Sequence, residues 1–197
     1  MSSTVSKKPK SDLIRLSVTL FAITAVIALV LAMINHVTAP KIAEIQQKKL
    51  ESAMSKVMPD GKTFEDVTQK VLDSWTGNTP LVNMQVAKDD AGTVVGYCVE
   101  VSPKGYSDII DMMVGINAAG EITGTDVIKI SDTPGIGTQV VSDPAFAAQF
   151  VGKSGTLQVG GAGVTLISGA TYSSTGFTNG VNAALSAYRI LTEEVSA

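Results

Sequence analysis

One apolar stretch limits what this chain can fold into more than any other feature. The run LSVTLFAITAVIALVLAMI, from Leu16 to Ile34, contains no charged side chain. At about 1.5 Å of rise per residue, a helix over this run is roughly 28 Å long, close to the hydrocarbon thickness of a bilayer. A cleaved signal peptide is the alternative, but its apolar region is shorter, and the small-residue site VTA is followed directly by Pro40. The sequence therefore predicts an uncleaved, single transmembrane helix over residues 16–36.

Basic residues give this helix an expected orientation. Lys7, Lys8, Lys10 and Arg15 precede the span, whereas the lysines that follow it lie further away and are mixed with glutamates. An excess of Lys and Arg close to one end of a span favours the cytoplasmic side. We therefore expect residues 1–15 in the cytoplasm, an amphipathic connector helix over residues 37–60 that opens at Pro40, and a domain outside the cytoplasm over residues 61–197.

Composition excludes several classes of function. The formal net charge is -3, so the clustered cations that bind nucleic-acid phosphates are not expected. Cys98 is the only cysteine, which rules out an intrachain disulfide and a Cys-based metal site. His36 is the only histidine and lies beside the apolar run, which excludes a Ser-His-Asp or Cys-His catalytic group in the domain. We therefore predict no metal site, no catalytic residue and no nucleic-acid partner.

The domain shows a change of pattern along its length. Four β-prone runs separated by turn residues predict strands over 81–87, 93–101, 109–116 and 121–130. Asp143-Pro144 resembles a helix start for PAFAAQF, and GTLQVG at 155–160 is predicted as a last strand. An apolar stripe at helical spacing predicts a C-terminal helix from about Ser173, lying on the sheet. The predicted class is α+β: one N-terminal transmembrane helix, then a mixed or antiparallel sheet with flanking helices.

Two short segments have residues suited to binding. In Asp132-Thr133-Pro134-Gly135-Ile136-Gly137, proline followed by glycine suits a type II turn. The second segment, Ser168-Gly169-Ala170-Thr171, enters the C-terminal helix, where unpaired backbone amides and the helix dipole favour an anion. From the residues alone, each segment has a simpler interpretation as well: a plain turn for the first, and a helix cap for the second.

The two segments together carry a family resemblance. The order GYSDIIDMMVGINAAGEITGTDVIKISDTPGIG followed by LISGATYSS resembles the FMN-binding domain shared by the G subunit of Rnf complexes and the C subunit of sodium-pumping NADH:quinone oxidoreductases. The resemblance covers roughly residues 80–190, and many family members have an acid where this chain has Thr165. It implies FMN joined through its phosphate to the hydroxyl of Thr171. It also implies Ser168, Gly169, Ala170 and Ser173 around the phosphate, and Thr133, Gly135, Ile136 and Gly137 along the flavin.

The resemblance also implies a function. The chain is short for the quinone reductase subunit, which favours the G subunit of an Rnf complex. Such a subunit relays electrons through covalent FMN in a bacterial inner-membrane machine that couples ferredoxin:NAD electron transfer to Na+ or H+ translocation. Its implied partners are other membrane subunits, including a second flavin-bearing subunit and iron-sulfur subunits, and a flavin transferase for maturation. Three alternatives stay open: the C subunit of the quinone reductase, a stand-alone membrane-anchored flavoprotein for extracellular electron transfer, and a non-redox binding module.

Overall fold

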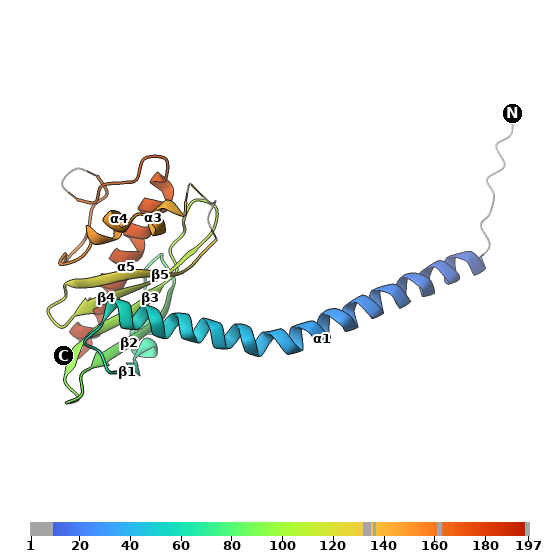
Figure 1. Cartoon of the computed structure of the whole chain (residues 1–197), viewed down its shortest axis with the longest axis horizontal. Helices are drawn as coiled ribbons and strands as arrows, with labels where there is room; N and C mark the ends of the chain where they lie inside the picture. The colour runs from blue at the N-terminus through green and yellow to red at the C-terminus, as the bar shows by residue number, and fades with distance from the viewer. Residues whose placement is uncertain (1–9, 132–134, 136, 161–162, 196–197) are drawn as a thin grey trace. The chain divides into compact units, whose positions relative to one another are not determined.

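The computed structural model describes residues 10–131, 135, 137–160 and 163–195, with side chains from residue 14 to residue 193. It divides into two compact units, residues 1–48 and residues 49–197, and each is described by itself. The first helix, α1 (Lys10–Val57), belongs to both units, because its last turns lie within the second (Figure 1).

In the first unit, α1 contains the apolar run and continues through Pro40. The expectation that a new helix opens at Pro40 is therefore wrong, although proline cannot donate the helical hydrogen bond to residue 36. The helix is long and apolar enough to be one candidate membrane span. Thr19 and Thr24 donate their hydroxyls to carbonyls four residues earlier, at 2.8 and 3.0 Å, which satisfies these polar groups within the helix itself.

The second unit is built on a five-stranded antiparallel sheet in which each strand pairs with the next one along the chain. The four predicted strands are confirmed, with bounds shifted by one residue at most, and a short edge strand precedes them. The sequence does not predict this edge strand, because TFED has no alternation of apolar and polar residues. The strands are β1 (Thr63–Asp66), β2 (Leu81–Lys88), β3 (Val94–Val101), β4 (Ile110–Asn117) and β5 (Ile122–Ile130).

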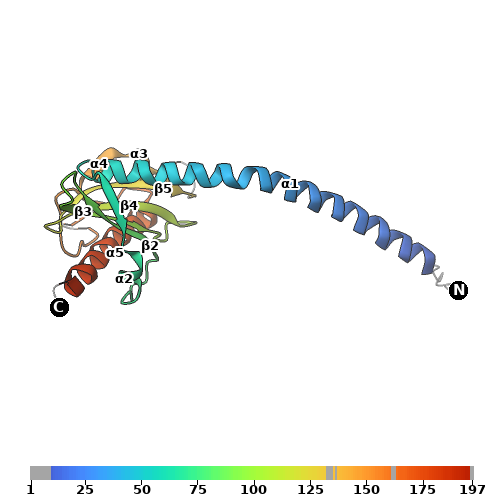
Figure 2. The same cartoon turned by 90° about the horizontal axis from the view of Figure 1, so that it is seen from below.

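Helices cover both faces of this sheet (Figure 2). The helix α5 (Thr171–Val195) packs on one face, where Phe177, Val181 and Leu185 join the main core with Val99 and Val114. On the other face, the last turns of α1 form a smaller cluster with the sheet residues that they contact: Ala53, Met54, Val57, Met58, Ala87, Cys98 and Met113. The α+β class is therefore confirmed, with an antiparallel sheet.

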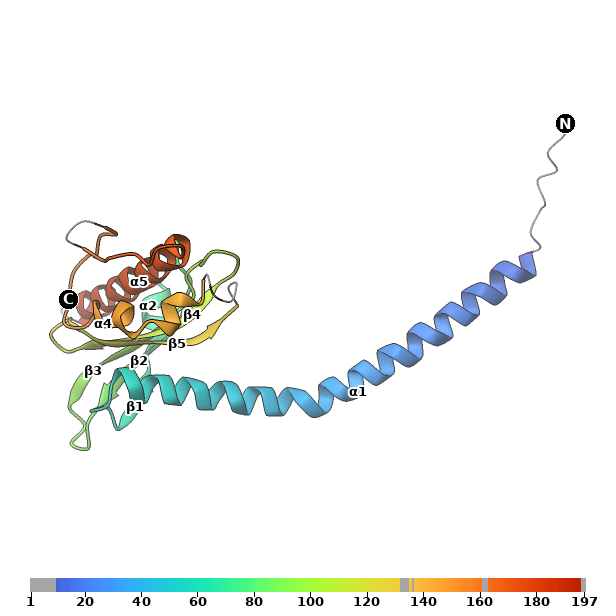
Figure 3. The same cartoon turned by 45° about the horizontal axis from the view of Figure 1, so that its top comes forward.

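Short helices complete the fold. α2 (Thr68–Leu72) contacts β2, α4 (Pro144–Ala148) contacts β5, and α3 (Gln139–Ser142) contacts α5 (Figure 3). The predicted helix start at Asp143 is confirmed, since its carboxylate accepts the Ala145 N–H at 3.0 Å. The strand predicted over residues 155–160 is wrong, because Gly155 and Gly160 have φ angles of 77° and 82°, outside the range of a strand. An isolated bridge between Val159 and Val164 forms there instead.

Candidate functional site at the start of α5

The segment before α5 makes a tight turn that ends at Thr171. The Ala170 N–H donates to the Ile167 carbonyl at 3.0 Å, which closes a four-residue turn with Ser168 and Gly169 at its centre. Gly169 has a φ of 82°, the value that a type II turn requires at its third position. α5 then begins with Thr171, and its first hydrogen bond runs from the Ser174 N–H to the Ala170 carbonyl at 2.9 Å.

The small residues before Thr171 have two different physical causes. At Gly169, an added Cβ meets no atom within 4 Å, so the positive φ and not crowding by the protein selects glycine. Ala170 is only 2% exposed, so a larger side chain there has no room. The backbone is thereby held in one conformation and the Thr171 side chain remains exposed.

Two side chains, one just after α4 and one in α5, fix the segment that leads into this turn. Gln149, just after α4, forms hydrogen bonds with both backbone groups of Thr165. Its amide N–H donates to the Thr165 carbonyl at 3.0 Å, and its oxygen accepts the Thr165 N–H at 2.8 Å. The Ser174 hydroxyl accepts the Ile167 N–H at 3.2 Å. The segment is therefore tied to α4 and α5 before it reaches Thr171.

A pocket of about 360 Å³ opens at this helix start. The backbone N–H groups of the first turn of a helix have no acceptor within the helix, and the helix dipole adds positive potential there. The lining of the pocket includes the first three residues of α5, whose backbone N–H groups belong to this first turn. The pocket is lined by Tyr106, Gly169, Ala170, Thr171, Tyr172 and Ser173.

Most residues of the predicted binding set lie in the described part of the chain. Gly169, Ala170, Thr171 and Ser173 share the pocket just described, whereas Ser168 lines a neighbouring one with Asp143 and Thr165. Thr133 and Ile136 lie outside the described residues. Gly135 and Gly137 come just before α3, and α3 contacts α5. Gly135 has a φ of 77°, as the predicted type II turn requires.

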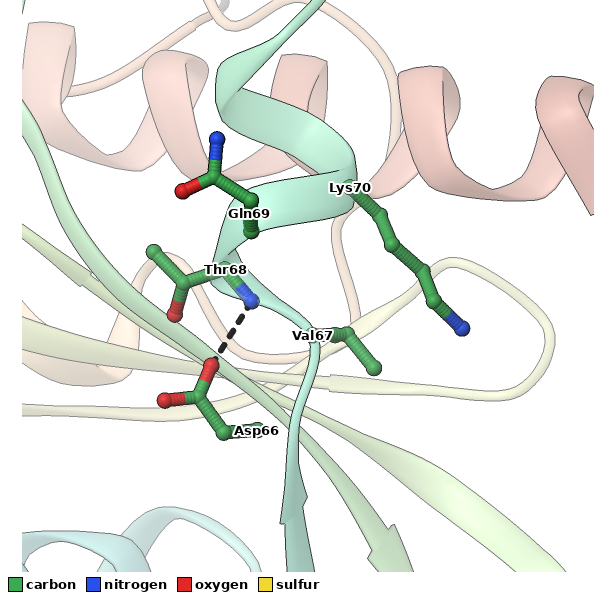
Figure 4. A pocket seen from close by; sticks show the side chains of 5 residues that line it. All are labelled: Asp66, Val67, Thr68, Gln69 and Lys70. Atoms are coloured by element: carbon green, nitrogen blue, oxygen red, sulfur yellow. Dashed lines mark hydrogen bonds between the residues drawn. The ribbon is translucent and has the colours of Figure 1, made fainter.

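A further pocket, at the start of α2, has a structural explanation (Figure 4). It is lined by consecutive residues from Asp66 to Lys70, and the Asp66 carboxylate accepts the Thr68 N–H at 2.8 Å. Hydrogen bonds from Thr68 lower the pKa of Asp66. Because the Asp66 carboxylate and the Thr68 N–H are hydrogen-bonded to each other, the turn that starts α2 accounts for this pocket without a ligand.

Sequence reasoning missed three residues near the site: Tyr106, Tyr172 and Gln149. Tyr106 reaches the pocket from the loop between β3 and β4, and nothing in the sequence indicates that this loop meets residue 171. The sequence places Gln149 only in a helix, because a side chain that pairs with a distant backbone leaves no local pattern. Within the described ranges, no group of three or more His, Cys, Asp or Glu side chains is placed to hold a metal ion.

Comparison with known families defines the class of this domain. Residues 105–186 match a family described as FMN-binding domain, and these residues include the pocket, the turn and most of α5. Residues 3–57 match a second family, described as RnfG N-terminal region, and this range includes all of α1.

Whole-chain relatives give the particular family. The G subunit of the Na+-translocating ferredoxin:NAD+ oxidoreductase complex of Acetobacterium woodii is 33% identical, over 91% of this chain and 93% of that protein. The G subunit of an ion-translocating oxidoreductase complex of Methanosarcina acetivorans is 34% identical, over 88% of this chain and 93% of that protein. The chain belongs to the family of G subunits of ion-translocating oxidoreductase complexes of the Rnf type.

Among solved structures, the crystal structure of Shewanella oneidensis NqrC is similar. It is 28% identical with a TM-score of 0.44, and the match covers 51% of this chain and 53% of that one.

Proposed function

We propose that this protein carries FMN covalently through a phosphoester on the Thr171 hydroxyl and relays electrons within an Rnf-type complex. The observation that carries the proposal is the position of Thr171. It is an exposed hydroxyl at the first residue of a long helix, beside a pocket, in a segment that matches an FMN-binding family.

The residues present fit a phosphate on this oxygen. The type II turn at Gly169 leads directly into α5, and the N–H groups of a first helical turn have no acceptor within the helix, which suits an anion there. Ala170 and the buried Ser173 bring no bulky side chain between that position and the backbone. Thr133, Gly135, Ile136 and Gly137 belong to the proposed flavin side of the site, while Ser168, Gly169, Ala170 and Ser173 belong to its phosphate side.

Bound FMN supplies one- and two-electron redox chemistry. The chain supplies retention and position, because an ester to Thr171 cannot dissociate as a free cofactor does. No residue of this chain is proposed to exchange a proton with a substrate, so it is an electron-transfer subunit and not a complete enzyme. In the complex we propose Na+ or H+ as the translocated ion, coupled to electron transfer between ferredoxin and NAD.

The proposed partners follow from this role. They are the other membrane subunits of the complex, including a second flavin-bearing subunit and iron-sulfur subunits, and a flavin transferase that forms the ester. We place the domain, residues 61–197, on the extracytoplasmic side of a bacterial inner membrane, with residues 16–36 as the single span. The lysines and the arginine before the span support this orientation.

Peptide mass spectrometry tests the attachment. Trypsin releases residues 154–189 between Lys153 and Arg189. The fragment from native, enzymatically competent protein is expected to carry the mass of FMN less one water, located on Thr171. Replacement by Thr171→Ala is expected to abolish the adduct.

Thr156 provides a matched control, because it is an exposed threonine on the same fragment and far from the start of α5 in sequence. Thr156→Ala is expected to keep the full adduct. An adduct that persists in Thr171→Ala moves the ester to another hydroxyl, and an unmodified wild-type fragment contradicts covalent flavin altogether.

Purification in mild detergent separates the proposed role from a stand-alone flavoprotein. A relay protein is expected to copurify with its complex and to pass electrons only there. Flavin-dependent reduction of an external acceptor by the isolated, washed chain at the rate of the complex contradicts the relay. The relatives favour the relay, since they match across both units of the chain.

A further inference from the structure

Two tyrosines flank Thr171 although they come from distant parts of the chain. Tyr106 lies in the β3–β4 loop and Tyr172 is the second residue of α5, and both line the pocket that contains Thr171. Their ring centroids are 5.9 Å apart with the planes tilted by 54°. The two rings therefore contact each other at an angle and form an aromatic surface, which is an aromatic corner at the pocket.

Both rings remain open to solvent despite this contact. Tyr106 is 54% exposed and Tyr172 is 72% exposed, whereas the other two tyrosines of the chain, Tyr97 and Tyr188, are half-buried and pack edge to face at 5.3 Å. Leaving two large aromatic rings exposed forgoes the free energy that their burial provides. A planar apolar ligand that covers the two rings provides this burial free energy.

The position of Tyr106 relative to Thr171 is fixed by close backbone packing. Gly176, in the second turn of α5, lies against the Lys104 carbonyl, and an added Cβ there overlaps that oxygen. Gly180, one turn later, lies against Pro103, whose Cγ is 2.7 Å from the position of an added Cβ. The loop is closed by a hydrogen bond from the Gly105 N–H to the Asp108 carbonyl at 2.8 Å, which holds Tyr106 at its tip. The aromatic surface is therefore built into the fold.

We propose that Tyr106 and Tyr172 bind the isoalloxazine ring of the flavin by stacking against it. This inference rests on the proposed ester at Thr171. A ring joined to Thr171 only by a flexible ribityl phosphate samples many positions, and ring stacking is the interaction that selects one of them. Each tyrosine is here a binding residue for the ring and has no part in forming the ester.

Tyrosine nitration tests the stacking on the unaltered sequence. Detergent-solubilised chain carrying the adduct is compared with chain produced in cells that lack the flavin transferase. Nitration of Tyr106 and Tyr172 is expected to fall several-fold in the flavin-bearing protein, while Tyr97 and Tyr188 serve as internal controls that do not change. Equal nitration of Tyr106 and Tyr172 in the two preparations overturns the proposal.

Flavin fluorescence provides an independent measurement. Tyrosine stacked on a flavin quenches its emission, so the double variant Tyr106→Leu, Tyr172→Leu is expected to be several-fold brighter per flavin than wild type. The single variants Tyr106→Trp and Tyr172→Trp keep a stacking and quenching ring and are expected to remain dark. Unfolding should reduce the difference in brightness between the variants.

The two proposals fail in different ways. A missing adduct on wild-type residues 154–189 contradicts the proposed function. An adduct that is present, with unchanged fluorescence in the double leucine variant and unprotected tyrosines, contradicts the stacking alone. If the double leucine variant does not acquire flavin, the nitration comparison on wild-type protein still tests whether the tyrosines stack on the flavin.

Discussion

Gly176 of α5 lies directly against the backbone carbonyl of Lys104, in the loop that presents Tyr106. The contact joins two segments that are far apart in sequence, and only a residue without a Cβ permits it. The distance between the start of α5 and the β3–β4 loop is therefore set by a glycine that belongs to neither the turn nor the pocket.

Replacing Gly176 with alanine is expected to force the loop away from α5, because the new methyl group meets backbone and not a flexible side chain. Overpacking of this kind costs about 1–3 kcal/mol of stability, less the gain in helix propensity from alanine. Urea unfolding of the detergent-solubilised chain, followed by the fluorescence of Trp75, the single tryptophan, measures the loss.

The neighbouring exposed position Asn179 is the control for helix propensity. Asn179→Ala lies on the same helix and is expected to leave stability equal or slightly higher. If Gly176→Ala is as stable as Asn179→Ala, the loop and α5 are not held by this contact.

Gln149 is expected to act as a positioning residue for the segment that leads to Thr171. Gln149→Ala removes both hydrogen bonds to the Thr165 backbone, and at about 0.5–1.5 kcal/mol each this amounts to about 1–3 kcal/mol. Flavin attachment to the variant is expected to slow, as measured by the adduct fraction against time after mixing with the transferase.

Gln158 is a suitable control, since it is an exposed glutamine in the same part of the chain. Gln158→Ala is expected to match wild type in both stability and attachment rate. Gln149→Glu keeps one acceptor for the Thr165 N–H but loses the donor, so an attachment rate between those of wild type and Gln149→Ala supports positioning by both bonds.

Glu100 is expected to make the free energy of unfolding of the domain depend on pH. Burial, with a smaller effect of the Asp111 charge, raises the pKa of Glu100 above 4.5. Between the unfolded pKa and this raised value, the folded state binds more protons than the unfolded state, so the free energy of unfolding falls as pH rises through that window. Glu100→Gln removes this effect and is expected to be more stable than wild type at about pH 8, with the difference shrinking towards about pH 4.

Urea unfolding at both pH values checks this expectation. Asp90→Asn removes an exposed carboxylate in the β2–β3 turn and serves as the control, with no comparable change between the two pH values expected. If Glu100→Gln is destabilised equally at both pH values, Glu100 stabilises the domain through a structural contact, and the expected electrostatic cost of its charge is absent.

The local elements of the fold were accessible from sequence, and the distant contacts were not. The β-prone runs around Val99 and Val114, separated by turn residues, identified β3 and β4, and the Asp143-Pro144 pair identified the start of α4. The segment 155–160 has a strand-like composition, but the left-handed backbone at its two glycines prevents a strand. The continuation of α1 through Pro40 was missed for a similar reason, because a local rule for proline was outweighed by the helix on either side.

In the candidate site, too, the local features could be predicted from the sequence and the distant contacts could not. Thr171 and the turn at Gly169 follow from four consecutive residues, and the family resemblance gave them a role. Tyr106 and Gln149 reach the same region through pairings that depend on the folded sheet and on α4. The residues that would bind the phosphate are local, whereas Tyr106 and Gln149, which would contact the ring and hold the segment, come from elsewhere in the chain.

The strand order has a consequence for biosynthesis. Because β1 to β5 pair in the order in which they are made, the sheet can assemble while the rest of the polypeptide is still on the ribosome or in transit. α5 follows the sheet in the chain, and the Thr171 hydroxyl stands at the start of a helix only after the residues of α5 have been made. A modifying enzyme that reads this helix start therefore acts only after α5 has been made, and a product truncated before residue 171 escapes labelling altogether.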